Sequence, residues 1–213
     1  MIRNTPFTCT SIALLGATLA VVALSGCSMN FVPIHYSRVN SAKSAAKPLE
    51  RGPNAPGAFK HVFQFGSATG YRFDPAQMEF SGGVVRLKRH PDQNGRFPSG
   101  RVFFETNSGI PYAALDGFAE VLGPANKGLT RYQISNDGSN WYYFHESRWK
   151  AATANPVHAN SANEINAKIG HFHTEVGSGS LFVRAFLISK GSDPVEIREL
   201  QVLGIAPQTD GWD

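Results

Sequence analysis

The densest set of aromatic side chains in the chain lies in residues 141–146, Trp-Tyr-Tyr-Phe-His-Glu. In an extended strand, successive side chains alternate between two faces, so Trp141 and Tyr143 face the same side. Flat rings bind the apolar face of a sugar, and a neighbouring charged group can bond its hydroxyl groups. Trp141, Tyr143, Arg148 and Trp149 are therefore the candidate carbohydrate-binding residues. The alternative is that these rings belong to the core and to a loop that covers the edge of a sheet.

His171, His173 and Glu175 alternate in the sequence, so an extended segment would place all three on one side. Imidazole and carboxylate groups suit Zn²⁺, Ni²⁺ or Cu²⁺. Three ligands at period two reach one ion only if the strand bends, and the neighbouring glycines favour a solvated loop. We therefore expect no metal and no cofactor, with these three residues as the alternative.

Two other polar groups have simple structural explanations. Asn136, Asp137 and Asn140 hold oxygen atoms that suit Ca²⁺, but their Asp-Gly pair is explained by the geometry of a tight hairpin. Arg86 and Lys88 share one face of a predicted strand, as side chains on a solvated sheet face do. The alternative partner for these two cations is an anionic surface, such as a membrane or the phosphates of lipopolysaccharide.

No arrangement typical of catalysis is found in the sequence. Ser, His and Asp occur, but no nucleophile elbow or other diagnostic spacing accompanies them. The acidic residues are scattered, so no glycosidase pair of carboxylates can be selected. We therefore expect that the protein is not an enzyme.

The composition excludes several further classes. Hydrophobic residues make up 42% of the 213 residues and charged residues 17%, which is enough apolar material for a core. The only cysteines are Cys9 and Cys27, so no disulfide scaffold, zinc–cysteine site or cysteine nucleophile can form beyond residue 27. Residues 1–57 carry five basic residues and one acidic residue, which accounts for the whole formal charge of +4. Residues 58–213 are neutral, and we expect no nucleic-acid partner.

The N-terminal residues have the pattern of a signal peptide. The mostly apolar run at 12–24 is too short to cross a membrane, for which roughly 20 residues are needed. It ends in Leu24-Ser25-Gly26-Cys27, which resembles the lipobox of bacterial lipoproteins. The resemblance implies that residues 1–26 are removed and that Cys27 carries acyl chains such as palmitate, which hold the protein on a membrane. Ser28, rather than Asp, after the cysteine implies the outer membrane of a Gram-negative envelope; the alternative is a signal peptide with a chance cysteine.

Residues 27–57 are predicted to form the lipidated cysteine and a disordered tether. They are rich in Ser, Ala, Pro, Asn and Lys, and Pro48, Pro53 and Pro56 prevent a continuous helix. A flexible coil of this length spans roughly 30 Å. Such a tether would hold a folded domain away from the bilayer.

Residues 58–213 are predicted to form one all-β domain. Short apolar runs alternate with turn residues, which is typical of an antiparallel β-sandwich. Ser161 and Glu164 have the spacing of a capping box, which predicts one short helix after them. Asp-Gly at 137–138 predicts a hairpin between the strands on either side. The predicted strands are 59–65, 71–80, 84–90, 101–106, 117–122, 129–135, 141–146, 181–189 and 195–204.

Three segments resemble discoidin-type, galactose-binding-like domains. The run at 131–141, Arg-Tyr-Gln-Ile-Ser-Asn-Asp-Gly-Ser-Asn-Trp, is similar to a strand–turn–strand of that family, and the runs at 181–187 and 195–204 are similar to its last two strands. The paired cysteines that bracket many such domains are absent. The resemblance implies a jelly-roll topology and a non-catalytic, carbohydrate-binding role. The sequence therefore predicts a lipid-anchored envelope protein that binds a glycan; the alternative is a structural or assembly lipoprotein that binds another envelope protein.

Overall fold

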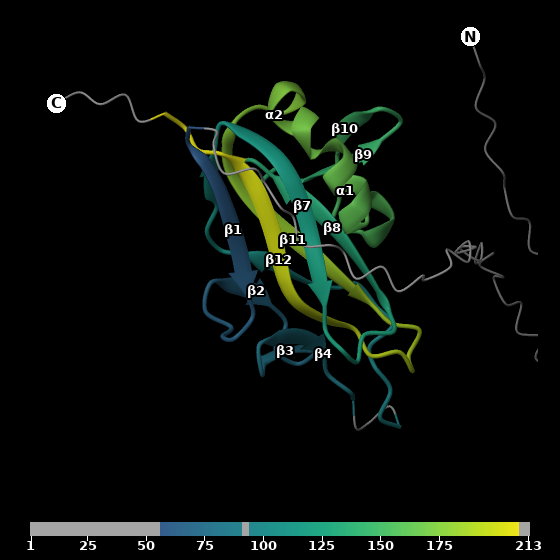
Figure 1. The fold of residues 1–213 in the computed structure, drawn as a ribbon. Coiled ribbons are helices and arrows are strands. Elements are labelled where there is room, and N and C mark those ends of the chain that lie inside the picture. Colours follow the sequence, from purple (N-terminus) through teal and green to yellow (C-terminus); the bar gives the residue numbers. More distant parts are fainter. Residues whose placement is uncertain (1–55, 91–93, 209–213) are drawn as a thin grey trace, which may run out of the picture. The chain divides into compact units, whose positions relative to one another are not determined.

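The computed structural model describes residues 56–90 and 94–208. The predicted signal peptide, Cys27 and the tether up to residue 55 lie outside the described residues. The described part folds into two antiparallel sheets that pack face to face (Figure 1). The predicted all-β sandwich is therefore confirmed.

The smaller, five-stranded sheet is organised around the last strand of the chain. Strand β12 pairs with β1 and β4 along one edge and with β7 along the other, and β3 extends the sheet beyond β4. The β1–β12 ladder is continuous from Ala58↔Ile205 to Gln64↔Glu199. The strands are β1 (Ala58–Gln64), β3 (Met78–Ser81), β4 (Val84–Leu87), β7 (Ala114–Leu122) and β12 (Glu196–Ile205).

The larger, seven-stranded sheet carries the residues that concern function. Its order is β10-β9-β8-β11-β5-β2, and β6 also pairs with the start of β11. The strands are β2 (Tyr71–Phe73), β5 (Val102–Thr106), β6 (Ile110–Tyr112), β8 (Leu129–Ser135), β9 (Tyr142–His145), β10 (Arg148–Ala151) and β11 (Gly179–Ile188).

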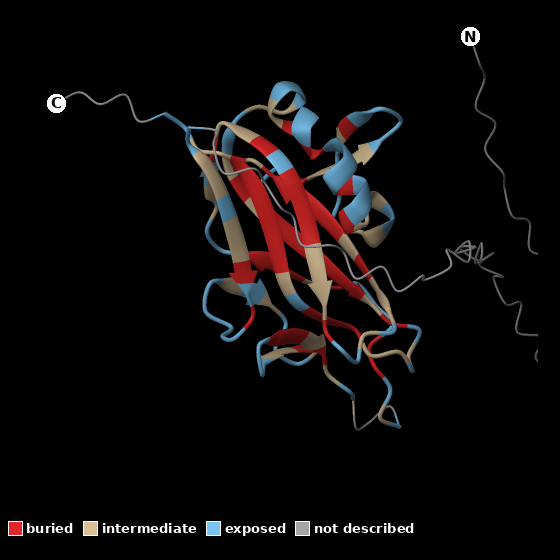
Figure 2. Ribbon diagram, in the orientation of Figure 1, coloured by how far each residue is buried: buried red, intermediate tan, exposed pale blue. Residues whose placement is uncertain are grey.

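The core lies between the sheets and follows the two-residue period of the strands. On β11, Leu181, Val183, Ala185 and Leu187 face inward and belong to the core, so Arg184 between them faces the outside of the sheet. Figure 2 shows the same buried character along the central strands of the sandwich. Burial of these side chains supplies most of the stabilising free energy of such a domain.

Short helices close the side of the sandwich next to β7 and β8 (Figure 1). The predicted capping box is present: Ser161 Oγ accepts from Glu164 N, and Glu164 Oε2 accepts from Ser161 N at 2.7 Å. Among the described residues, no helix combines the length and the apolar character that a membrane span requires. The helical elements are η2 (Pro156–His158), α1 (Ala162–Lys168), η3 (Ile169–His171) and α2 (Phe172–Glu175).

The predicted single strand over 71–80 is wrong. It is divided into β2 and β3, which belong to different sheets. The cause is a turn at Asp74, whose Oδ1 accepts from Ala76 N at 2.9 Å while its carbonyl accepts from Gln77 N and Met78 N. Pro75 also lacks the backbone N–H that a central strand needs.

Two further strands were absent from the sequence prediction, whereas the predicted hairpin is confirmed. Strands β8 and β9 pair antiparallel at Ile134↔Tyr142, and Gly138 in the turn between them has a φ of +75°. Strand β10, which was not predicted, returns from β9 through a two-residue turn at Glu146 and Ser147, both with positive φ. The short strand β6 was not predicted either.

Candidate functional site

Both candidate tryptophans are buried, each with an exposed fraction of 7%. The ring of Trp141 lies under the guanidinium of Arg184, whose carbon is 4.1 Å from the ring centroid. Trp149 belongs to the core, where its ring meets Phe144 and Phe172 edge to face at centroid distances of 5.6 Å and 4.9 Å. Neither ring therefore presents an open face on which a sugar could stack.

Tyr143 is half-buried on the outer face of the larger sheet. Its ring stands in a row between the rings of His145 and His158, at centroid distances of 5.7 Å and 5.1 Å and nearly parallel to both. Arg148 is exposed at the start of β10, on the strand whose Trp149 faces inward. The four candidate residues are therefore not brought into one site, and Tyr143 and Arg148 are the accessible members.

The candidate metal ligands do not lie on an extended segment. Residues 169–175 are helical, so His171, His173 and Glu175 do not alternate on one side as the sequence prediction required. Glu175 Oε2 accepts from the backbone N of Trp149 at 2.8 Å, which fixes β10 against α2. The ranges 56–90 and 94–208 contain no group of three His, Cys, Asp or Glu residues that could hold a metal ion.

Asp137 organises the turn after β8. Its Oδ1 accepts from the backbone N of Ser139 and of Asn140, each at 2.8 Å, and its Oδ2 accepts from Asn140 Nδ2 at 2.7 Å. These bonds stabilise the charged carboxylate and lower the pKa of Asp137 to about 2. The turn itself thus uses both carboxylate oxygens of Asp137, the one charged candidate ligand for a calcium ion.

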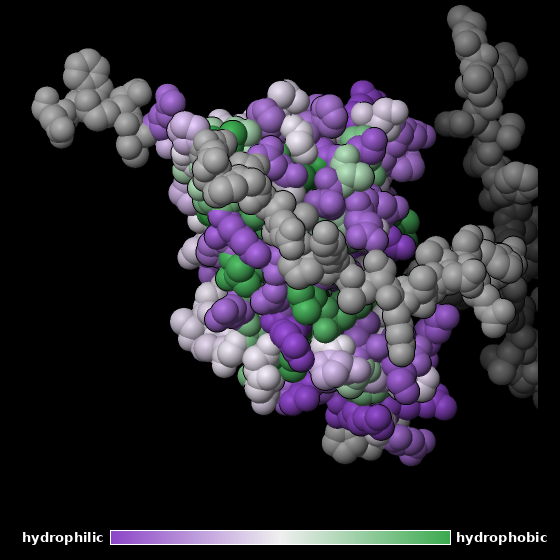
Figure 3. Space-filling view, viewed as in Figure 1, coloured by the Kyte–Doolittle hydropathy of each residue, from purple (hydrophilic) through white to green (hydrophobic). Residues whose placement is uncertain are grey.

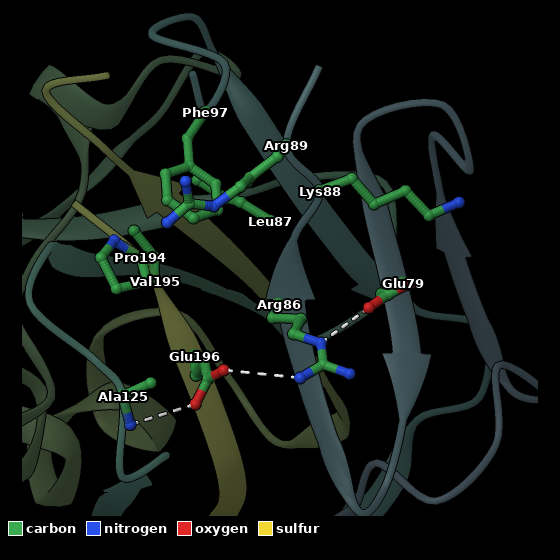
Figure 4. A pocket seen from close by; sticks show the side chains of 10 residues that line it. All are labelled: Glu79, Arg86, Leu87, Lys88, Arg89, Phe97, Ala125, Pro194, Val195 and Glu196. Atoms are coloured by element: carbon green, nitrogen blue, oxygen red, sulfur yellow. Dashed lines mark hydrogen bonds and ion pairs between the residues drawn. The ribbon is translucent and has the colours of Figure 1, made fainter. Parts of the chain in front are cut away.

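The basic strand residues lie beside a surface pocket of about 560 Å³ (Figure 4). Arg86 Nε is 2.7 Å from Glu79 Oε1, and Arg86 Nη1 is 3.7 Å from Glu196 Oε1. Lys88 extends away from Arg86 in Figure 4, and its Nζ donates to the carbonyl of Pro75 at 2.7 Å. The cations of this pocket do not converge on one point, and two carboxylates already neutralise Arg86.

A row of polar side chains crosses the outer face of the larger sheet. Arg72, Glu105, Arg184 and Gln133 are register partners on the adjacent strands β2, β5, β11 and β8. Arg184 Nε donates to Glu105 Oε1 at 2.6 Å and Arg184 Nη1 donates to Gln133 Oε1 at 2.7 Å, while Arg72 Nε donates to Glu105 Oε2 at 2.7 Å. The row is continuous because each side chain bonds to the next.

Gln133 links the polar row to the segment that precedes α1. Its Nε2 donates to the carbonyls of Thr153 and His158 at 2.7 Å and 2.6 Å, and lies 3.4 Å from that of Asn155. These bonds hold η2 and its flanking residues over the sheet. This explains how a glutamine on the outer face can be fully buried.

The other end of the polar row borders a surface pocket of about 470 Å³, here called the β2–β5 pocket. It is lined by residues of β2, of the β2–β3 turn, of β5 and of the position directly before β5: Arg72, Phe73, Asp74, Gln77, Arg101, Val102, Phe103 and Glu105. Alternation along β5 places Phe103 and Glu105 on one face of that strand. An apolar ring is thus surrounded by charged and amide side chains, which is the composition of a site for a small polar ligand.

Sequence reasoning did not single out the residues of this pocket. One signal was present: Glu105 and Arg184 each interrupt a strongly apolar strand, and a charge in such a strand must be paired if it is buried. The sequence contained no information on which charges pair, because Arg72, Glu105 and Arg184 are far apart along the chain. Only the order of the strands brings them together.

The comparisons with known proteins assign no family to this arrangement. No protein-family model, no curated protein and no solved structure matches the chain.

Proposed function

We propose that the chain is a lipoprotein of the bacterial outer envelope whose β-sandwich binds a glycan without catalysing a reaction on it. The Leu24-Ser25-Gly26-Cys27 run supports the lipid anchor, and the β2–β5 pocket supports the binding role. The resemblance of the last strands to galactose-binding-like domains agrees with both the fold and the ligand class.

The anchor is tested by replacing its acceptor. Cys27→Ser removes the only thiol beyond residue 26, so the variant should take up no labelled palmitate and should leave the detergent-rich phase of a phase-separation experiment. Cys9→Ser is the matched control, because Cys9 belongs to the segment that a signal peptidase would remove. Equal labelling of the Cys27→Ser variant and the parent chain would overturn this part of the proposal.

One observation carries the binding role: the half-buried ring of Phe103 lines the pocket together with Arg72, Asp74, Gln77 and Arg101. A volume of about 470 Å³ lies within the range of sites for small ligands. A sugar ring has an apolar face and an edge of hydroxyl groups. The pocket offers the accessible part of the Phe103 ring for the first and donors and acceptors for the second. The rest of that ring lies against the guanidinium of Arg184 and the ring of Phe186, at 5.2 Å and 5.4 Å from its centroid.

The carboxylates of the pocket support a non-catalytic role. Glu105 accepts from Arg72 and Arg184 at the same time, so two cations already engage its carboxylate. Asp74 Oδ1 and Oδ2 accept from Ala76 N and Gln77 Nε2, at 2.9 Å and 2.8 Å. Both carboxylates are thus engaged by partners within the chain, whereas glycoside hydrolysis needs a pair of carboxyl groups that face the sugar.

The alternative, an assembly lipoprotein that docks on another protein, has less support from the described residues. Val157, at 57% exposure, is the one large hydrophobic side chain there that is classed as exposed. In the view of Figure 3, hydrophilic side chains cover most of the described surface and hydrophobic ones gather in smaller areas. A docking interface would need a contiguous apolar patch of several hundred Å².

The binding role is tested on a glycan array with the full-length chain in detergent. Phe103→Leu keeps most of the apolar volume but removes the flat ring, so binding should fall strongly. Tyr143→Leu is the matched control, because Tyr143 is another half-buried ring on the outer face of the same sheet, outside the pocket. The proposal fails if no glycan binds, and the site assignment fails if Tyr143→Leu, rather than Phe103→Leu, removes binding.

A further inference from the structure

We propose that the glycan bound in the β2–β5 pocket is acidic, and that the guanidinium of Arg101 binds its carboxylate. This inference rests on the proposed function and deepens it, because it names the ligand class of the same site. It follows from how the charges around the pocket are paired with one another.

The first step concerns the cations on Glu105. This carboxylate is 3% exposed and accepts from two guanidinium groups: Arg184, which is buried, and Arg72, whose side chain is 72% exposed. One negative charge thus faces two positive charges, which leaves a local excess of one cation at the wall of the pocket. Of the two cations, Arg184 is buried and Arg72 is exposed. The excess positive charge is therefore accessible at Arg72.

The second step concerns Asp74, the other acid of the pocket. Both of its carboxylate oxygens accept hydrogen bonds within the β2–β3 turn, from Ala76 N and Gln77 Nε2. These bonds orient the carboxylate toward its own turn. No ion pair joins Asp74 to Arg72 or Arg101 in the described part of the chain, so Asp74 does not remove the excess positive charge.

The third step concerns Arg101, which lines the pocket from directly before β5, two residues before Phe103. Arg101 is exposed, and no hydrogen bond or ion pair joins it to another described residue. A guanidinium is planar and offers paired donors that match the two oxygens of a carboxylate. Arg101 is therefore the cation of this pocket that is available to a ligand.

Arg101 and Phe103 line the same pocket on either side of Val102, where β5 begins. Two residues of chain span at most about 7 Å, which is about the width of a sugar ring with its substituents. The ring of Phe103 can thus contact the apolar face of a uronic-acid residue while Arg101 binds its carboxylate. A neutral sugar would offer this guanidinium hydroxyl oxygens alone, whereas a carboxylate accepts a charge-assisted pair of hydrogen bonds.

The test compares acidic oligosaccharides with the same molecules after chemical reduction of their carboxyl groups, which keeps the sugar skeleton and removes the charge. Oligogalacturonate and its carboxyl-reduced form are the first pair, followed by any acidic glycan that binds on the array. With the full-length chain, the acidic form should bind about tenfold more tightly, as expected for one charge-assisted contact. The preference should weaken as salt is raised, because ions screen exposed charges.

Arg101→Gln should remove this preference, so that the variant binds the acidic and the reduced form equally. Arg101 is exposed, so the variant should fold, and an unchanged thermal midpoint checks this. Lys190→Gln, which removes an exposed cation outside the pocket, is the matched control and should keep the preference. Equal binding of the acidic and reduced forms by the parent chain, or a preference that survives in Arg101→Gln, overturns the inference and leaves the proposed function standing. If no glycan of either kind binds on the array, both fail.

Discussion

Arg184 and Glu105 face each other on adjacent strands with both side chains buried, and Arg184 Nε and Nη2 lie 2.6 Å and 2.5 Å from Glu105 Oε1. The rings of Trp141 and Phe103 lie against the same guanidinium, with its carbon 4.1 Å and 5.2 Å from their centroids. Both charged side chains are buried, although they lie on the outer face of a sheet and not between the two sheets. The pair connects the proposed binding pocket to the segment that Gln133 holds over the sheet.

Replacing Arg184 should destabilise the domain strongly. Arg184→Ala leaves the buried carboxylate of Glu105 with Arg72 as its single cation, and breaking a buried pair costs about 3–5 kcal/mol. Because Arg72 remains, we expect the lower end, about 3 kcal/mol, in urea unfolding of the full-length chain. The exposed Arg148→Ala should change the free energy of unfolding by less than about 0.5 kcal/mol. A loss below about 1 kcal/mol in Arg184→Ala would show that the pair is not needed for stability.

Replacing Gln133 should release the segment 153–158. Gln133→Glu keeps an oxygen that accepts from Arg184, but it loses the Nε2 that donates to the carbonyls of Thr153 and His158. Amide hydrogen exchange of this segment should therefore speed up, while exchange in β11 should stay near the parent value. Unchanged protection of residues 153–158 would mean that other contacts hold the segment.

Removing the cap of α1 should have a moderate and local effect. Ser161→Ala deletes the Oγ that accepts from Glu164 N, which costs about 1 kcal/mol. The thermal midpoint should fall by a few degrees, and Asn163→Ala, on the exposed side of the same helix, is the control. A midpoint equal to that of the parent would show that packing of Ile165 and Ile169 alone holds the helix.

Glu120 should make stability fall as pH rises. Its Oε2 accepts from Thr130 Oγ1 at 2.6 Å and from the hydroxyl of Tyr132, and burial raises the pKa of Glu120 despite these bonds. The folded state then keeps a proton that the unfolded chain loses above about pH 4.3. The corresponding stabilisation is complete below that pH and is lost as pH rises toward the raised folded pKa of Glu120.

The comparison with Glu120→Gln isolates this effect, because the amide keeps an oxygen acceptor and cannot titrate. The free energy of unfolding of Glu120→Gln, relative to the parent chain, should increase as the pH rises from about 4 and then level off. Urea midpoints measured between pH 3.5 and 7 at constant ionic strength give this difference. Parallel curves for the two chains would show that Glu120 titrates alike in the folded and unfolded states.

Most of the fold could be predicted from the sequence, because the two-residue period of apolar side chains marks a buried strand face directly. The prediction missed β10 because its turn uses Glu146 and Ser147, where positive φ values usually select Asn and Gly. It joined β2 to β3 because it gave too little weight to the turn signal Asp74-Pro75 between the aromatic residues Phe73 and Phe80. Both errors concern turns, whose residues lack the two-residue period by which strands are recognised.

The candidate site was less predictable, for a different physical reason. Trp141 and Trp149 were predicted as binding residues because they lie in a segment rich in aromatic side chains. The two-residue period shows which side chains share a face of a strand, but it does not show which face other segments cover. Trp149 packs into the core, and Trp141 is covered by Arg184 from a strand about 40 residues later in the chain. The β2–β5 pocket is formed by residues that are ordinary in the sequence and become notable through the pairing of β2 with β5.

The pairing of β1 with β12 has a mechanical consequence for a domain held by its N-terminal end. A pull that reaches the domain through residue 57 enters at Ala58, and β1 is bound to β12 along all seven of its residues. Tension directed along β1 therefore loads this ladder in shear, so that its hydrogen bonds resist together and do not open one after another. For a chain anchored at its N-terminal end as proposed, drag on the domain would load this ladder, and β12 would hold β1 in place.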